Sequence, residues 1–214
     1  AYKKIVLKEF DKLKKSSNAK FEIVGSYRRG AQSSGDIDLI ITDTPDNQAI
    51  FHAFIEALVH KGVIIEVLSK GKIKSMVIGK LRGKPARRID FMFTPPHEYP
   101  FAILYFTGSK AFNVTMREHA KTLGYSMNEH RMSNVKDNTP VALQFNDEQS
   151  IFDFLGLEFK DPLNRRDGRA VVAVTTTAST PTEEIQVKVA PKNRTLKKKK
   201  TSTKKLMKKL MKNG

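Results

Sequence analysis

The sequence from Gly25 to Thr42 reads GSYRRGAQSSGDIDLIIT, a glycine- and arginine-rich turn that runs directly into an apolar strand. The strand opens with two acids, Asp36 and Asp38, and continues through Leu39-Ile40-Ile41. Successive side chains of a strand alternate between its faces, so both carboxylates point the same way, about 7 Å apart. Acids at the exposed end of a strand that is otherwise buried on both faces predict a site for two divalent cations.

The turn before these acids has the composition of an anion-binding site. A short strand over residues 21–24 leads into it, and a helix can begin at Tyr27 to Gly30. Backbone amides at a helix start, together with the Ser26 hydroxyl and the Arg29 guanidinium, suit a triphosphate. A surface loop with solvated charges is the alternative for the turn taken alone, and the acids that follow favour the phosphate site.

A third acid lies further along the chain. Helices are expected over residues 2–16 and 44–61, and strands over 63–68, 72–81 and 86–93. Asp90 lies in the last of these strands, directly after two arginines. If this strand neighbours the one that carries Asp36 and Asp38, three carboxylates share one site. Taken alone, Asp90 could equally be a structural aspartate.

The second half of the chain has a different composition. After a break at Thr94-Pro95-Pro96, helices are expected over residues 99–107 and 109–123, with Ser109 as the N-cap of the second. A hairpin is expected within 125–145, with its turn at 134–138, and a last helix begins at Asp147. The folded part is expected to end at Asp161-Pro162.

The charge of the chain indicates a polyanionic partner. The net charge is +17, and residues 165–214 hold 15 of the 39 Lys and Arg but 3 of the 22 Asp and Glu, a net +12. Nucleic acid is favoured over membrane, because no apolar run approaches the roughly 20 residues of a spanning helix. The absence of cysteine excludes disulfides and thiolate metal sites and favours an intracellular protein.

The basic end of the chain leaves three alternatives open: a nuclear import signal, an electrostatic DNA tether, or a spacer without function. Four apolar side chains recur there at three- and four-residue spacing, so the segment could form an amphipathic helix on a polyanion or a membrane surface. These are Leu206, Met207, Leu210 and Met211. The tether and the import signal are favoured.

Four ordered blocks resemble the signature motifs of family X DNA polymerases, the group of DNA polymerase beta. They are GSYRRG at 25–30, SSGDID at 33–38, RRID at 87–90 and YFTGS at 105–109. The similarity runs in register from about Val6 to about Asp161. It implies an α+β fold, with a nucleotidyltransferase palm of mixed sheet and flanking helices over residues 1–95. A small thumb-like subdomain over 96–164 and a disordered basic tail over 165–214 would follow.

The resemblance also implies roles for individual residues. Asp36 and Asp38 would bind two Mg²⁺ ions, for which Mn²⁺ could substitute, and Asp90 would bind the catalytic ion beside the primer 3′ oxygen. Eight residues would contact the incoming nucleotide: Ser26, Arg29, Ser34, Gly35, Tyr105, Phe106, Gly108 and Asn113. Arg88 would lie near the primer end, Arg117 would reach the template strand, and Glu129 would help to hold a closed conformation.

The chain departs from the family pattern at several positions. Lys110 stands where the beta enzyme has an acid, Val114 where it has a basic residue, and His130 where it has a tyrosine. Met92 replaces an arginine that can compete for a metal-binding acid. The sequence shows no lyase or helix-hairpin-helix segment before the palm motifs. In this respect the chain resembles the minimal form found in some large DNA viruses, or a fragment of a longer protein.

The implied function is template-directed DNA synthesis on primed or gapped DNA, by two-metal phosphoryl transfer from deoxynucleoside triphosphates. Gap filling in base excision repair is the expected setting, by a monomer, in a nucleus or at a viral replication site. Two alternatives are a template-independent terminal or RNA-tailing transferase and a non-catalytic DNA-binding relative. Tyr105, Phe106 and Arg117 favour the templated enzyme, and the three acids argue against a non-catalytic one.

Overall fold

The computed structural model describes residues 2–14, 18–43 and 48–175. The expected start of a helix at 44–46, the helix stop at 16–17 and the amphipathic segment at 206–211 lie outside the described residues. The first part of the chain, which we call the sheet subdomain, contains α1 (Tyr2–Leu13), β1 (Lys20–Ile23), α2 (Gly25–Arg28), β2 (Asp36–Thr42), α3 (Ala49–His60), β3 (Ile64–Lys70), β4 (Lys74–Gly79) and β5 (Arg87–Phe93). Among the described residues, no helix is long and apolar enough to cross a bilayer.

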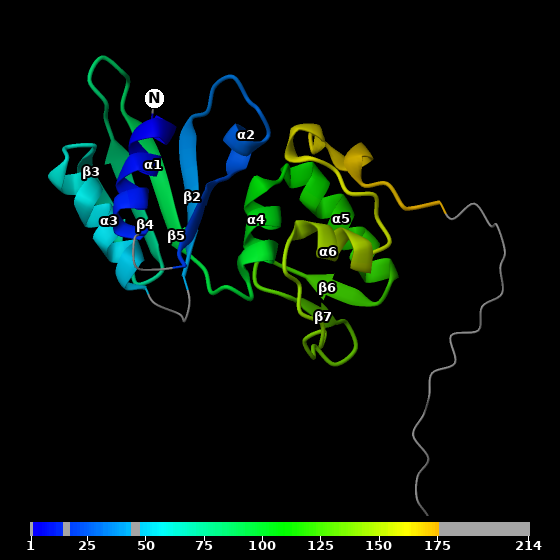
Figure 1. Cartoon of the computed structure of the whole chain (residues 1–214). Coiled ribbons are helices and arrows are strands. Elements are labelled where there is room, and N and C mark those ends of the chain that lie inside the picture. Colours follow the sequence, from blue (N-terminus) through cyan, green and yellow to red (C-terminus); the bar gives the residue numbers. More distant parts are fainter. Residues whose placement is uncertain (1, 15–17, 44–47, 176–214) are drawn as a thin grey trace, which may run out of the picture. The chain divides into compact units, whose positions relative to one another are not determined.

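The five strands of this subdomain form one mixed sheet in the order β1-β2-β5-β4-β3. Only β2 and β5 run parallel, and the other neighbours are antiparallel. Helices α1 and α3 cover one face of the sheet (Figure 1), and their apolar stripes, with Phe10 and Phe54 among them, are fully buried against it. The expected α+β architecture with a mixed sheet is confirmed.

Strand β2 is buried on both faces, as its apolar run predicts. Leu39 and Ile41 belong to the core beneath α1 and α3. Ile40 points to the opposite face, where it packs with Ala102 and Ile103 of α4. The acids at the start of the strand are therefore carried by a backbone that is packed from both sides.

The second part of the chain, which we call the helical subdomain, contains α4 (Tyr99–Thr107), α5 (Lys110–Thr122), β6 (Tyr125–Met127), β7 (Met132–Asn134) and α6 (Glu148–Phe154), followed by two short 3₁₀ helices (Pro162–Asn164 and Gly168–Ala170). It has its own core, in which Phe112 and Phe152 are fully buried. Ser109 caps α5 as expected, because its hydroxyl accepts a hydrogen bond from the Phe112 amide.

The region of the predicted hairpin contains one turn more than expected. β6 and β7 pair around a turn at residues 128–131. The predicted turn at 134–138 is also present, because the Asn138 amide donates to the Asn134 carbonyl and the chain returns to an antiparallel bridge between Ser133 and Pro140. The Asn128 side chain fixes the turn at 128–131, because its oxygen accepts hydrogen bonds from the amides of His130 and Arg131, both at 2.9 Å. Such a local side-chain contact replaces a backbone turn and carries no periodic signal in the sequence.

The folded part also extends further than predicted. The sequence predicts that residues 165–175 belong to the basic tail, but Arg165 is completely buried in the helical subdomain. Its guanidinium lies 5.2 Å from the Phe152 ring centroid and pairs with Glu148. The loss of apolar periodicity after Asp161 therefore does not mark the end of the fold, because an ion-paired arginine takes the place of an apolar anchor.

Candidate active site

The parallel pairing of β2 with β5 brings the three predicted acids together. Asp38 lies directly opposite Asp90, and Asp36 lies opposite Arg88. Residues two apart on a strand share a face, so all three carboxylates point to the same face at the same end of the sheet. Two hydrogen-bonded strands packed in one core therefore fix the backbone positions of the three acids.

Arg88 balances two of these carboxylates. Its Nη2 lies 2.5 Å from Asp36 Oδ2, and its Nε lies 3.1 Å from Asp90 Oδ1. The contact with Asp90 lacks hydrogen-bond geometry, so Asp90 Oδ1 is a buried oxygen that accepts no hydrogen bond. Among the described residues, no group of three or more acidic or histidine side chains is already arranged to hold a metal ion.

Asp38 lies in an unfavourable electrostatic environment for a carboxylate. Burial raises the pKa of Asp38, and the negative charges of Asp90 and Asp36 raise it further, while Arg88 opposes the shift. A carboxylate surrounded in this way gains most from an additional positive charge. The three carboxylates on β2 and β5 therefore carry more negative charge than Arg88 alone neutralises.

The predicted phosphate turn lies beside these acids. Helix α2 is a single turn of four residues that begins at Gly25 rather than at Tyr27. Ser26 Oγ and Ser34 Oγ are 3.0 Å apart, and Ser34 donates to the Asp36 carbonyl at 2.5 Å. Two of the residues predicted to bind the nucleotide, Ser26 and Ser34, are therefore in contact. Gly35, the next residue, has open space around the position of a Cβ.

Gly25 is required by this arrangement for a reason that sequence reasoning missed. Its φ is +65°, and a Cβ there would lie 2.6 Å from Asp38 Oδ2.

Arg29 connects the turn to the helical subdomain, because its Nη1 donates to the Thr107 carbonyl at the end of α4. That guanidinium would also lie 3.3 Å from a Cβ on Gly108. The first and last signature motifs, GSYRRG and YFTGS, are therefore in direct contact.

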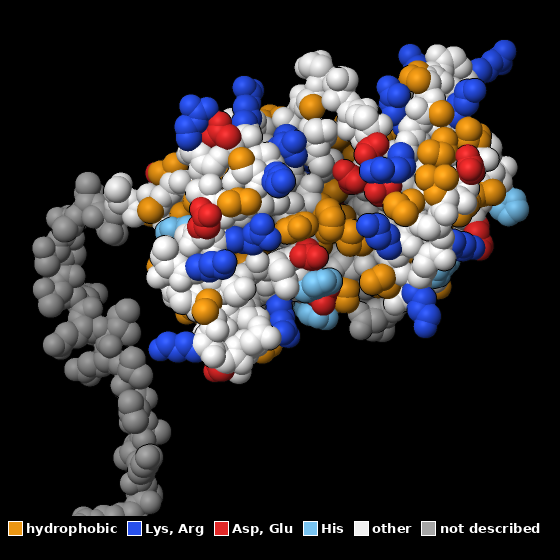
Figure 2. Space-filling model, turned by 180° about the vertical axis from the view of Figure 1, so that it is seen from behind, with side chains coloured by type: hydrophobic (Ala, Val, Ile, Leu, Met, Phe, Trp, Pro, Cys, Tyr) orange, Lys and Arg blue, Asp and Glu red, His pale blue; other side chains and the backbone are white. Residues whose placement is uncertain are grey.

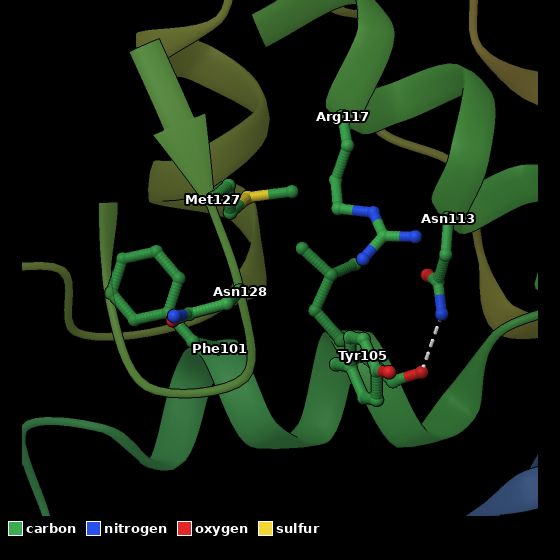
Figure 3. Close-up of a pocket in the computed structure, with 7 residues that line it drawn as sticks. Phe101, Tyr105, Asn113, Arg117, Met127 and Asn128 are labelled. Carbon is green, nitrogen blue, oxygen red and sulfur yellow. Dashed lines mark hydrogen bonds between the residues drawn. The ribbon is translucent and has the colours of Figure 1, made fainter. Parts of the chain in front are cut away.

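The residues predicted to meet the base and sugar form a second group, on the helical subdomain (Figure 3). Asn113 Nδ2 donates to the Tyr105 carbonyl at 2.6 Å, and the Arg117 guanidinium lies 5.8 Å from the centre of the Tyr105 ring. A pocket of only about 10 Å³ separates them from Phe101 and Met127. Asn113 and Arg117 of α5 are thus both in contact with Tyr105 of α4.

Phe106 and Glu129 line a different pocket, although the Phe106 ring still meets the Tyr105 ring edge to face, with ring centroids 5.1 Å apart. Phe106 packs against the core formed by β2 and α4. Together with Glu129, His130 and Met92 it lines a separate pocket of about 320 Å³. The His130 ring is anchored there, with its Nδ1 2.8 Å from Glu98 Oε2. Lys110 and Val114, two of the departures from the family pattern, are exposed on α5.

A buried ionic network joins the two subdomains and was not predicted. Arg28 donates to both oxygens of Glu148, at 2.6 and 3.0 Å, and to Thr107 Oγ1 at 2.7 Å. Arg165 donates to the same carboxylate. Burial alone would lower the pKa of Arg28, but Glu148 outweighs burial and raises it. The sequence signal for this network is the pair Arg28-Arg29, of which the sequence analysis gives a role only to Arg29.

The surface around these groups carries both signs of charge. On the face seen in Figure 2, Lys and Arg side chains are spread over the described surface, and a group of acidic side chains gathers near its middle with Lys or Arg beside it. This distribution agrees with an acidic site surrounded by basic surface.

Comparison with known proteins gives two matches to family models. Residues 1–96 match the DNA polymerase beta palm, and residues 102–166 match the DNA polymerase beta thumb. Together the two models follow the described fold from α1 to the first 3₁₀ helix. The palm match ends after β5, and the thumb match begins within the first turns of α4.

Relatives show the same relationship over most of the described chain. DNA polymerase lambda of Rattus norvegicus is 34% identical over 158 residues, which cover 66% of this chain and 28% of that protein. The DNA polymerase/3′-5′ exonuclease PolX of Bacillus subtilis is 31% identical over 153 residues, covering 71% and 25%. The repair DNA polymerase X of African swine fever virus is 27% identical over 142 residues, covering 66% and 79%. The chain thus spans between a quarter and a third of the first two relatives and most of the viral one.

Proposed function

The chain belongs to the family X DNA polymerases, the group of DNA polymerase beta, and on this premise we propose that it is a template-directed DNA polymerase that adds deoxynucleotides to a primer 3′ end. The proposed substrates are primed or gapped DNA and deoxynucleoside triphosphates, used by a monomer. The relative from African swine fever virus is named a repair polymerase, which supports gap filling in base excision repair as the setting. A nucleus or a viral replication site would be the place of action.

The acids at the ends of β2 and β5 fit divalent cations. Asp90 Oδ1 is a buried hard oxygen donor without a hydrogen bond, and the raised pKa of Asp38 reflects the mutual repulsion of the cluster in addition to burial. Asp36 and Asp38 would hold two Mg²⁺ ions and Asp90 the catalytic one. When bound, such ions lower the pKa of the primer 3′-hydroxyl and neutralise charge on the attacking and leaving oxygens.

Arg88 has to give up its present partners in this proposal. It occupies Asp36 and Asp90, which are the groups that would hold the cations. Because its side chain is 46% exposed, it can turn toward solvent without leaving a buried charge. Once released, the guanidinium would bind a phosphate near the primer end.

The phosphate turn would orient the triphosphate. The hydroxyls of Ser26 and Ser34 face one another at 3.0 Å, and Arg29 supplies a positive charge at the edge of the turn. Groups fixed in advance by the backbone lose little entropy when the ligand arrives, so they act mainly through positioning and electrostatics. The link from Arg29 to Thr107 would transmit the presence of the triphosphate to α4.

Tyr105, Asn113 and Arg117 would read the nascent base pair. Asn113 and Arg117 are at present engaged with Tyr105, and the pocket between them has almost no free volume. A base or sugar can enter only if these contacts separate. The helical subdomain is therefore proposed to change its side-chain contacts on substrate binding, while the strands of the sheet subdomain stay in place.

The pairing of Asp38 with Asp90 across parallel strands is the observation that carries the proposal. Its test is primer extension on a one-nucleotide gap in Mg²⁺, with Asp90→Ala compared with Asp11→Ala, which removes an exposed acid from α1. Extension should fall at least about 1000-fold in Asp90→Ala, because a ligand of the catalytic ion is lost, and should persist in Asp11→Ala. Equal activity of the two folded variants would refute the assignment.

A template-independent transferase is the second candidate. Lys110 and Val114 are exposed where the beta enzyme has an acid against the incoming base and a basic residue against the template, so template contacts on α5 differ from the family pattern. Extension with and without a template strand, using deoxynucleotides and ribonucleotides in parallel, separates the two. Templated incorporation of deoxynucleotides supports the polymerase, whereas equal incorporation without a template supports the transferase.

A further inference from the structure

A groove of about 400 Å³ lies at the same end of the sheet as the acids but belongs to its other face. Residues of a strand alternate in direction, so Ile37 of β2 and Arg87 of β5 point away from the face that carries Asp36, Asp38 and Asp90. Both Ile37 and Arg87 line the groove, and Ser34 of the phosphate turn lies at its border with the proposed nucleotide site. The sequence motif RRID thus sends one arginine to each face, and the proposed polymerase site uses only Arg88.

The lining of this groove is basic and contains no acid. Lys3 at the start of α1, Lys84 in the loop before β5, and Arg87 converge on it. Their contacts within the described residues are with neutral groups, since Lys3 lies over the Tyr27 ring and Arg87 donates to the Ala86 carbonyl at 3.2 Å. Their charges are therefore available to an anion, and their origin in separate elements suits a ligand that carries more than one phosphate along its length.

Two tyrosines and an apolar floor complete the groove. The Tyr27 side chain is 43% exposed, and Lys3 Nζ lies 5.8 Å from the centre of its ring. Ile23 and Ile37 form apolar surface beside it, and Tyr2 also lines the groove. An accessible aromatic ring next to cations is the combination that binds nucleobases by stacking and their phosphates by charge.

We propose that this groove binds a nucleoside phosphate unit of a single DNA strand, with a base against Tyr27 and phosphates on Lys3, Lys84 and Arg87. Its volume lies within the roughly 300–1000 Å³ of small-molecule sites, which is enough for one nucleotide. The choice of DNA as the source of that unit rests on the proposed function. The nucleotides on either side of this unit would continue along the basic surface of the protein.

The test uses the absence of tryptophan from the sequence. Tyr27→Trp introduces a single fluorophore into the groove of the full chain, and (dT)12 is titrated in EDTA without nucleotide triphosphate. We expect saturable quenching by stacking, and an unchanged signal from Phe159→Trp, a control on the exposed surface of the helical subdomain. If Tyr27→Trp fails to fold, Gln32→Trp places the probe at the exposed rim of the same groove.

A matched pair of double variants in the probe background tests the charges. Lys3→Ala with Lys84→Ala should weaken (dT)12 binding and flatten the slope of log K against log salt by about 1.4, since each phosphate contact on a single strand contributes about 0.7. Lys8→Ala with Lys121→Ala removes the same net charge from exposed positions outside the groove and should change the slope by less than a third of that.

Three results would overturn the proposal. They are no quenching with either probe, equal losses in the two double variants, or displacement of (dT)12 by polyglutamate at equal charge concentration. If dTMP saturates the groove at the same concentration as (dT)12, the assignment to a strand is wrong and a free nucleotide is the ligand. Because no metal or triphosphate is present, the measurement is independent of catalysis, and the groove should bind (dT)12 normally in Asp90→Ala even where extension is lost.

Discussion

The two subdomains hold their candidate functional groups in different ways. In the sheet subdomain the acids stand on hydrogen-bonded strands that are packed from both faces, so the backbone sets their positions. In the helical subdomain Asn113 and Arg117 are held by contacts with Tyr105, which a ligand has to replace. Under the proposed function, the chemistry would lie on strands packed from both faces, and substrate selection on side chains whose contacts a ligand has to replace.

The ionic network between the two subdomains is where a single substitution should have the largest effect on stability. Glu148 joins Arg28 of the sheet subdomain to Arg165 of the helical one, and both Glu148 and Arg165 are buried. Glu148→Ala leaves two arginines without their partner and should destabilise the protein by about 3–5 kcal/mol. Denaturant unfolding measures this loss. Lys160→Ala, which removes a surface pair with Glu158, should cost less than about 1 kcal/mol. A similar small cost in both variants would show that the network does not join the subdomains.

Gly25 tests whether the sheet subdomain is as rigid as proposed. Gly25→Ala adds a Cβ that meets Asp38 Oδ2 at 2.6 Å, in a backbone with φ +65°. Gly62→Ala is a matched control, since Gly62 has the same φ and open space around it. Both should lose about 1–2 kcal/mol of stability from backbone strain. Only Gly25→Ala should also reduce primer extension, by at least about tenfold, because Asp38 is displaced. Equal extension by the two variants would mean that the position of Asp38 is adjustable.

The strain on Asp38 predicts a pH effect in the metal-free protein. Its pKa is raised in the folded state, so the unfolded chain loses this proton first, and stability falls as the pH rises from about 4 through the folded pKa. Asp38→Asn should therefore raise the melting temperature at pH 7 in EDTA and leave it nearly unchanged at pH 3.5. Mg²⁺ should stabilise the wild type more than this variant. A lower melting temperature of Asp38→Asn at pH 7 would contradict the proposed repulsion.

The smallest effect is expected from Asn113. Asn113→Ala removes one hydrogen bond to the Tyr105 carbonyl and should cost about 0.5–1.5 kcal/mol of stability. Because this contact has to open when a base enters, the KM for the incoming nucleotide should change more than kcat. Steady-state extension kinetics measure the two constants separately. A fall in kcat alone would place Asn113 in the chemical step instead.

The same contrast explains what the sequence could predict. The alternation of Asp36, Asp38 and the apolar run gives the strand, its faces and the acid pair from local information alone. The four ordered motifs then imply the partner strand with Asp90, and the structure brings the three acids together. Local pattern and family resemblance are both informative here because the strands are regular.

The parts that the sequence did not reveal depend on contacts between distant residues. Nothing near Arg165 indicates that it is buried beside Glu148 and three phenylalanine rings, so the fold was expected to end too early. The position of the β6–β7 turn depends on one asparagine side chain. The contact of Arg88 with Asp36 and Asp90 could be placed only once the register of the parallel strands was known.

The most direct test of the account is whether the three carboxylates hold divalent cations. Mn²⁺ binding can be followed by electron paramagnetic resonance in the presence of a non-hydrolysable deoxynucleoside triphosphate, for the wild type, Asp90→Asn and Asp11→Asn. The account predicts that Asp90→Asn binds the ion near the primer position at least about tenfold more weakly, while Asp11→Asn matches the wild type. Equal Mn²⁺ binding by all three folded proteins would contradict it.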